Sequence, residues 1–337
     1  MNATISPEEK KHYPVLLEEI LSIITPPRYG GTFIDCTFGL GGYSRRILEI
    51  PNSKVVAIDR DPNSKRFSED LSKNYQNRFR FENKKFSEID TLNVDQEDLS
   101  CIIFDLGCSY HQIKDLKKGL SFYSSGKLNM RMGFNDFSAH EVVNKLQKKE
   151  LERIFKVFGD EKDGAKIASK IIKTRERKDI DTQELVRIID SSKKKKNRRI
   201  HNATKVFQAL RIFVNKEVSE LIYGLIKATK LLKPGGLLII VTFHSLEDKI
   251  VKFFFKNFSE QKSVSRYLPN KVNKKLLFLM DKKKPIIPSL KEITENPPSR
   301  SAKLRYVIKN ENLDDFADEF IKKFQELINI ENLGKRL

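Results

Sequence analysis

The sequence contains no apolar stretch close to the ~18 residues that a membrane-spanning helix requires. Its first ten residues carry neither an apolar core nor an arginine-rich amphipathic pattern, so no targeting segment is visible. The only cysteines, Cys36, Cys101 and Cys108, lack C-x-x-C spacing and cannot form a zinc site by themselves. Cys36 and Cys101 lie in apolar, strand-like runs, where buried and inert thiols are expected. These absences favour a reduced, cytoplasmic protein.

Three kinds of active-site motif are also missing. No (Asp/Asn/Ser)-Pro-Pro-(Tyr/Phe) turn follows the fourth expected strand, which argues against a DNA amino-methyltransferase. The dinucleotide fingerprint G-x-G-x-x-G would need glycine where Ser44 stands, which argues against a nicotinamide oxidoreductase. His244, Ser245 and Asp248 crowd one helix start and cannot adopt triad geometry, and no nucleophile elbow occurs. A hydrolase is therefore excluded.

The composition is strongly basic. The 337 residues are enough for about two domains and carry a net charge of +19, with a pI near 9.6. A positive field of this size favours a polyanionic partner, most often a nucleic acid. The alternative is a lysine-rich codon bias without any such partner.

A glycine turn near the N-terminus organises the chain. Residues 32–36 are expected to form a buried strand that breaks into this turn, followed by a helix from about Ser44. The next strand ends at Asp59, where an acidic residue commonly binds ribose hydroxyls. The pattern Asp35-x-x-x-Gly39-x-Gly41-Gly42 resembles motif I of S-adenosylmethionine (AdoMet) methyltransferases, whose acidic residue and turn face the methionine end of the cofactor. A glycine turn without a ligand is the alternative.

The remaining pattern predicts a doubly wound α/β sheet interrupted by a helical insertion. Further strands are expected over 54–58, 78–82, 101–106, 237–243 and 304–308. About 130 residues separate the fourth and fifth strands, far more than a normal crossover. Helical periodicity is present over 12–24, 139–158, 164–175, 182–191, 203–230, 244–255 and 313–330, and residues 257–288 are expected to be irregular.

A block of like charge, Lys193–Arg199, lies between two of these helices. Such runs are usually solvated loops, but phosphate neutralisation supplies much of the affinity for nucleic acids. Contact with RNA and a bare solvated loop are therefore both open for this segment.

Six stretches in order resemble the RsmH (MraW) family of AdoMet-dependent methyltransferases. They cover residues 35–44, 59–62, 105–109, 130–132, 207–212 and 243–248, and similarity extends from about residue 12 to residue 305. The resemblance implies a class I AdoMet-dependent methyltransferase (Rossmann-like) sheet with an inserted helical substrate-recognition domain. It divides the chain into a methyltransferase domain of two parts, 1–113 and 213–310, the insertion, 114–212, and a C-terminal helix, 311–337.

The resemblance also implies the reaction. The family transfers a methyl group from AdoMet to N4 of a cytidine in the decoding region of small-subunit (16S) ribosomal RNA, and the assembled subunit is the expected form of the substrate. It implies no metal and no membrane, and it leaves the oligomeric state open. A paired or stacked cytosine would have to leave its helix to react.

Family site positions carry over one by one. The implied cofactor-binding residues are Gly41, Gly42, Tyr43, Asp59, Phe86, Asp105 and Gln112. Phe86 would flank the adenine, although a core phenylalanine is an equal interpretation. Asp105, at the end of the fourth strand, is our choice as the catalytic acceptor near the reacting amino group.

The sequence departs from the family pattern near this site. Tyr110 and His111 stand where the family usually has Ser-Pro, and Asn129 and Gly133 replace two acidic residues beside Met-Arg-Met. A change in the target pocket is therefore expected, with His111 either a titrating group or a simple surface histidine. A non-catalytic RNA-binding protein is the remaining alternative, but it would not need Gly39, Asp59 and Asp105 together.

Overall fold

The computed structural model describes residues 14–25, 30–108, 112–113, 115–124, 126–133, 135–193, 201–260 and 275–337. The chain divides into two compact units. The first unit combines residues 1–107 with 221–321, and the second combines 108–220 with 322–337. The expected division at residues 113, 212 and 310, which follows from the strand spacing and the family resemblance, remains a prediction.

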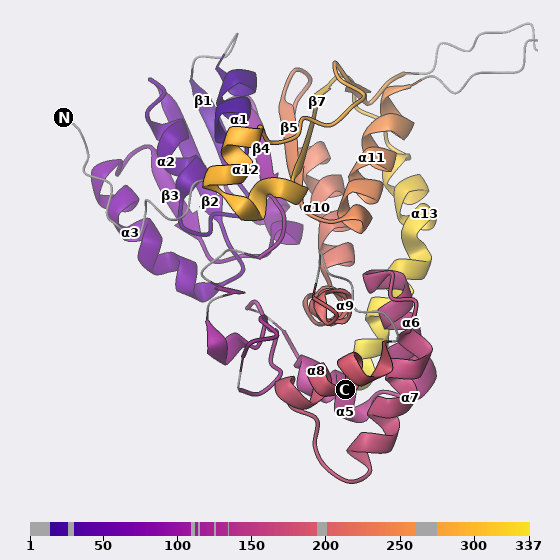
Figure 1. The fold of residues 1–337 in the computed structure, drawn as a ribbon. Coiled ribbons are helices and arrows are strands. Elements are labelled where there is room, and N and C mark those ends of the chain that lie inside the picture. The colour runs from indigo at the N-terminus through magenta and orange to yellow at the C-terminus, as the bar shows by residue number, and fades with distance from the viewer. Residues whose placement is uncertain are drawn as a thin grey trace, which may run out of the picture. The chain divides into compact units, whose positions relative to one another are not determined.

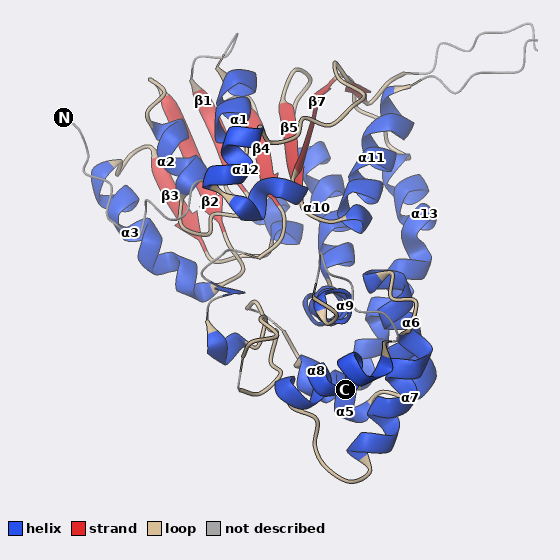
Figure 2. Cartoon of the chain, in the orientation of Figure 1, coloured by secondary structure: helices blue, strands red, loops and turns tan. Residues whose placement is uncertain are grey.

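The first unit is built on a seven-stranded sheet with the order β3-β2-β1-β4-β5-β7-β6 (Figures 1 and 2). The strands are β1 (Gly31–Asp35), β2 (Ser53–Ile58), β3 (Phe79–Glu82), β4 (Leu99–Asp105), β5 (Leu237–Thr242), β6 (Phe278–Leu279) and β7 (Lys303–Lys309). The first five are parallel, whereas β7 runs antiparallel to both β5 and β6. The sequence predicted every strand except β6, which has only two residues.

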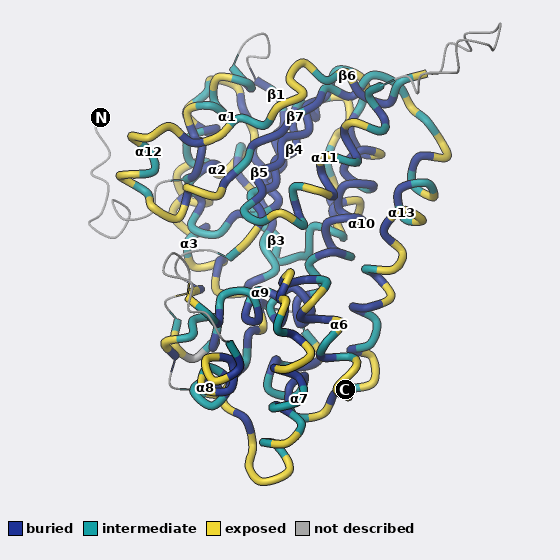
Figure 3. The backbone as a smooth tube through the Cα atoms, turned by 45° about the vertical axis from the view of Figure 1, so that its right-hand side comes forward, coloured by how far each residue is buried: buried dark blue, intermediate teal, exposed yellow. Residues whose placement is uncertain are grey.

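The strand order reverses between β1 and β4. In open α/β sheets, ligands bind outside the carboxyl ends of the strands at such a switch in strand order. The central strands are apolar on both faces, and all six residues of β5 are buried (Figure 3). This burial fixes the strand ends that carry Asp35 and Asp105.

Helices cover the sheet of the first unit. They are α1 (Leu17–Ile24), α2 (Gly42–Leu48), α3 (Lys65–Asn74), the later part of α10 (Glu217–Leu231), α11 (Ser245–Ser259), α12 (Leu290–Glu295) and the first residues of α13 (Phe316–Glu331). Gly224 in α10 meets Phe86 and Phe104 so closely that an added Cβ would lie 2.7 Å from the Phe86 ring. Glycine within a helix is otherwise unfavourable, and here it allows close packing. The helix expected from Ser44 begins two residues earlier.

The second unit is helical in its regular structure. Its helices are α5 (Ala139–Lys145), α6 (Lys148–Gly159), α7 (Gly164–Arg175), α8 (Thr182–Ser192), α9 (Thr204–Asn215), the start of α10 and the end of α13. None of the helices in the described parts of the chain combines the length and apolarity that a membrane crossing requires.

Two expected helices are each broken in two, which corrects the sequence prediction. The helix predicted over 139–158 ends at Lys145, because Gln147 and Glu150 form a capping box that starts α6. The helix predicted over 203–230 breaks at Lys216, whose φ of 50° is left-handed. Apolar periodicity continues across both breaks, so spacing alone could not reveal them.

Candidate active site

The glycine turn connects β1 to α2 at the carboxyl edge of the sheet. Gly39 and Gly41 have φ values of 54° and 79°, a conformation that side-chain-bearing residues rarely adopt. Among the described residues, a Cβ on Gly39 would meet nothing closer than the Thr37 carbonyl oxygen at 3.8 Å, so they leave this face of the turn open. The backbone of the turn can therefore be approached closely by a ligand.

Asp35 stabilises this turn through the hydrogen bonds of its carboxylate. Its carboxylate accepts hydrogen bonds from Ser44 Oγ at 2.7 Å and from the Thr37 backbone N–H at 3.2 Å. The side chain is completely buried, and burial raises its pKa to about 6 despite these hydrogen bonds. Asp35 thus shapes the loop from the interior, whereas the motif comparison had placed it facing the ligand.

Asp59 connects the second strand to the same turn. One carboxylate oxygen accepts from the Gly39 N–H and the other from the Asp61 N–H, both at 2.7 Å. Burial raises the pKa of Asp59, and these backbone hydrogen bonds oppose that shift. The Ser64 side chain also hydrogen-bonds this carboxylate, so of its about four lone-pair positions about one remains for a hydroxyl of a ligand.

Asp105 ends β4, the strand next to β1. Its backbone N–H donates to Thr37 Oγ1 at 2.7 Å, which ties the two strand ends together. Its Oδ1 is buried and has no hydrogen-bond partner among the described residues. A buried acceptor without a partner is costly in a folded protein and often marks a functional site. Thr37 was not singled out from the sequence, because a threonine in a turn carries no distinctive signal.

The surroundings of Asp105 favour the neutral form of its carboxyl group. Burial raises its pKa well above the usual range, and the negative charges of Asp35 and Glu247 raise it further. Tyr43 has one hydroxyl hydrogen, which it donates to the Val15 carbonyl oxygen. Tyr43 also contacts the Asp105 side chain, and this contact lowers the pKa of the carboxyl but is outweighed by burial.

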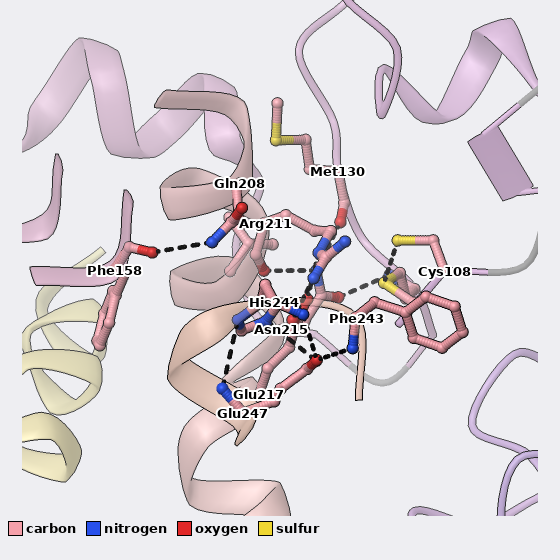
Figure 4. A network of polar contacts seen from close by, with 12 residues as sticks. Cys108, Met130, Phe158, Gln208, Arg211, Asn215, Glu217, Phe243, His244 and Glu247 are labelled. Carbon is pink, nitrogen blue, oxygen red and sulfur yellow. Dashed lines mark hydrogen bonds and ion pairs between the residues drawn. The ribbon is translucent and has the colours of Figure 1, made fainter. Parts of the chain in front are cut away.

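Glu247 is the third buried carboxyl at this edge. It lies in the first turn of α11, and one of its oxygens accepts from the backbone N–H groups of Phe243 and His244 at 2.8 and 3.2 Å (Figure 4). The next residue, Asp248, pairs with Arg305 and Lys303 of β7. The stretch 243–248 thus acts as a helix cap that also holds the edge of the sheet.

The remaining predicted residues lie in different surroundings. Phe86 packs edge-on against Phe104, with ring centroids 5.4 Å apart, so at least part of its ring serves packing. Tyr43 is buried in the core, and its side chain reaches Asp105. A Cβ on Gly42 would collide with Pro14, which explains that glycine by packing. Gln112 is buried and belongs to the second unit.

A second polar network, in the second unit, supports the stretch Met130–Met132. Asn215 at the end of α9 accepts from the Met132 N–H at 2.9 Å and donates to the Met130 carbonyl at 2.9 Å (Figure 4). Met130 has a φ of 59°, a strained conformation for methionine. Its neighbour Arg131 is exposed, so the network presents this guanidinium to solvent.

Arg211 secures the end of α9 near this network. Its guanidinium forms two hydrogen bonds to Glu217, at 2.8 and 2.9 Å, across the break between α9 and α10. In the same motif Gln208 reaches the Phe158 carbonyl of α6 (Figure 4). The motif at 207–212 therefore joins helices of the second unit.

Only one residue of the basic run is described. Lys193 pairs with the buried carboxylate of Glu161 at 2.6 Å and donates to the Asn202 carbonyl at 2.7 Å. Lys193 therefore has partners within the protein, and contact of the basic run with RNA stays a prediction. The other residues, 194–199, and the departures at Tyr110 and His111 lie outside the described residues.

Strand order and site together define a class of protein. Five parallel strands in the order 3-2-1-4-5, followed by an antiparallel β7 and with carboxylates at the switch between β1 and β4, form a class I methyltransferase fold. This is the fold class that the sequence predicted.

Comparison with known proteins assigns the family. The model of the MraW methylase family matches residues 9–310, and the chain belongs to this family. Similar proteins named ribosomal RNA small subunit methyltransferase H come from Ehrlichia canis (43% identity over 88% of this chain and 99% of the relative) and Bartonella quintana (42%, over 90% of each). Another, from Rhizobium meliloti, is 39% identical over 96% of this chain and 95% of the relative. The family resemblance is thereby confirmed.

Proposed function

We propose that the chain transfers a methyl group from AdoMet to N4 of a cytidine in the decoding region of small-subunit ribosomal RNA. Family membership and the names of the relatives support methylation of this RNA. The observation that carries the chemistry is the unpartnered Oδ1 of Asp105 at the switch point of the sheet.

The residues present fit AdoMet. The open face of Gly39 gives room for a ligand at the turn, and the remaining acceptor capacity of Asp59 suits a ribose hydroxyl. When bound there, AdoMet would supply an electrophilic methyl group attached to a sulfonium. Gly41, Gly42, Tyr43, Phe86 and Gln112 remain the proposed contacts beside Asp59 and Asp105.

Asp105 would orient the cytosine amino group. The nitrogen lone pair of N4 is delocalised into the ring, so the amino group reacts only when held at a defined angle and distance. A buried acceptor such as Oδ1 can hold one N–H hydrogen and thereby aim the lone pair. A positive charge near Asp105 would also favour its ionised form, because it offsets the burial that keeps the carboxyl neutral.

The surplus proton leaves after methyl transfer. Once N4 has gained the methyl group it carries a positive charge, which is lost as one N–H proton. The ionised Asp105 carboxylate lies where it can receive that proton and return to the neutral form favoured by burial. We therefore propose that Asp105 accepts a hydrogen bond from the amino group before methyl transfer and takes up the N4 proton after it.

The decisive test is methyl transfer from labelled AdoMet to small ribosomal subunits that lack the modification. Free ribosomal RNA and duplex DNA serve as alternative substrates, and the methylated nucleoside is identified by mass spectrometry. N4-methylcytidine from subunits or free RNA is the expected product, and which of them is modified would settle the substrate form. Tight AdoMet binding without transfer to any of the three would overturn the assignment of the target.

A further inference from the structure

Tyr123 is unusually exposed for an aromatic residue. It lies in a loop of the second unit and is 75% accessible to solvent. The other strongly exposed tyrosine among the described residues, Tyr223, is only 37% accessible. Tyrosine normally buries most of its ring, so an exposed ring on a basic surface calls for a partner.

The rings of Phe122 and His201 lie next to Tyr123. The ring of Phe122 lies parallel to the imidazole of His201, with centroids 4.1 Å apart and planes inclined by 5°. Tyr123 lies 4.7 Å from Phe122 and is inclined by 56°, and Phe207 supports Phe122 edge-on from α9. We call Phe122, Tyr123 and His201 the aromatic platform.

The platform is held in place from two sides. Gln183 of α8 donates to the Ser124 carbonyl at 2.8 Å, which fixes the loop directly after Tyr123. His201 Nδ1 accepts from the Ala203 backbone N–H at 3.2 Å, which fixes the plane of the imidazole. A platform ordered before binding loses little conformational entropy when a flat ligand stacks on it.

The same hydrogen bond defines what His201 can offer. Because Nδ1 accepts, the neutral imidazole carries its hydrogen on Nε2 and can donate it to a partner. The unit that carries the platform has 31 Lys and Arg against 17 Asp and Glu, a net charge of +14. Flat rings, one polar donor and an excess of positive charge match an unpaired nucleobase and its phosphate.

We propose that the aromatic platform stacks one unpaired base of a single-stranded RNA segment, with Tyr123 as its outer ring. This inference rests on the proposed function, in which the chain acts on ribosomal RNA. It assigns to the second unit a base contact in addition to the general attraction of phosphates. Such a contact matches the need to hold a strand whose target cytosine has left its helix.

The chain has no tryptophan, which allows a direct test. Tyr123→Trp places a single fluorescent reporter on the platform, and Tyr223→Trp is the matched control in the first unit. We expect a single-stranded RNA oligonucleotide to quench the fluorescence of Tyr123→Trp and to leave that of Tyr223→Trp nearly unchanged. An abasic oligonucleotide of the same charge should quench much less. Equal quenching by both oligonucleotides would mean that only phosphates are contacted, and would overturn the proposal.

Affinity gives a second readout. Stacking on an aromatic side chain contributes about 1–3 kcal/mol per base, so Tyr123→Ala should weaken oligonucleotide binding by about 5- to 150-fold. Tyr123→Phe should bind within about 2-fold of the natural chain, since it keeps the ring. An unchanged affinity of Tyr123→Ala for the oligonucleotide would refute stacking. Quenching of Tyr123→Trp by isolated ribosomal proteins, and not by RNA, would refute it as well.

These measurements separate the platform from the proposed reaction. If no substrate is methylated but base-dependent quenching is seen, the reaction fails and the platform stands. If subunits are methylated equally well by Tyr123→Ala and its oligonucleotide affinity is unchanged, the reaction stands and the platform fails. The AdoMet affinity of Tyr123→Ala and Tyr123→Phe, measured by calorimetry, should equal that of the natural chain. Equal affinities would show that the first unit is intact in these variants.

Discussion

The second unit of this chain carries a net charge of +14, whereas the first, with 33 Lys and Arg against 28 Asp and Glu, carries only +5. The first unit concentrates its chemistry in buried carboxyl groups, Asp35, Asp105 and Glu247, at the carboxyl edge of one sheet. The second unit spreads positive charge over helices and loops. A small cofactor needs a few groups in fixed positions, while an RNA is attracted by a surface field. The difference indicates that the two halves of the proposed reaction are divided between the units.

The largest effect should come from Asp105. Asp105→Ala removes the buried acceptor, and we expect methyl transfer to fall at least about 100-fold while the fold survives. Asp105→Asn is the matched control for charge, because it keeps an acceptor oxygen and nearly the same shape. It should lose transfer as well if the ionised carboxylate is needed. Near-normal turnover by Asp105→Ala would remove this residue from the mechanism. It would also contradict the view that the carboxyl groups of the first unit carry the chemistry.

Sequence and structure agree best where spacing dictates geometry. The glycine turn, Asp59 and Asp105 were predictable, since parallel strands bring their carboxyl ends to one edge of a sheet. The raised pKa of Asp105 was not, because it depends on burial and on the charges of Asp35 and Glu247, which approach Asp105 only in the folded chain. The breaks at residues 146–147 and 216 were hidden for a similar reason, since apolar periodicity continues across them.

The polar network of the second unit should give the next largest effect. Asn215 is completely buried, and Asn215→Ala would leave the Met132 N–H and the Met130 carbonyl without their partner. We expect a loss of about 3 kcal/mol in the free energy of unfolding, measured by urea denaturation. The exposed Asn329→Ala, in the same unit, should change it by less than about 0.5 kcal/mol. The AdoMet affinity of Asn215→Ala should not change. A loss of that affinity together with the loss of stability would contradict the assignment of cofactor binding to the first unit.

A smaller effect should follow from neutralising part of the basic run. Replacing Lys194, Lys195 and Lys196 by Ser removes three charges and leaves the pair between Lys193 and Glu161 intact. For single-stranded RNA, each lost phosphate contact should flatten the dependence of log affinity on log salt by about 0.7, so the slope should change by up to about 2. Binding titrations at several salt concentrations measure this slope. An unchanged slope would mean that these lysines only form a solvated loop.

The smallest effect concerns a buried ionisable group in each unit, Glu331 in the second and Lys309 in the first. Glu331 accepts from the N–H groups of Val218 and Ser219 and from the Ser219 hydroxyl at the start of α10, yet its burial raises its pKa from 4.5 to about 8. Between these values the folded chain binds one proton more than the unfolded chain. Stability should therefore fall with rising pH, by up to about 1.4 kcal/mol per unit for this group.

Glu331→Gln should remove this fall between about pH 4.5 and 8. Lys309 gives the opposite sign in a higher range, because burial lowers its pKa from 10.5 to about 8. From pH 8 to 10.5 the unfolded chain binds the extra proton, so this group raises stability as pH rises, and Lys309→Met should remove that rise. Urea denaturation of both variants and the natural chain, at matched pH, measures each difference. If the Glu331→Gln curve stays parallel to that of the natural chain from pH 4.5 to 8, Glu331 is ionised in the folded protein, because its three donors outweigh its burial.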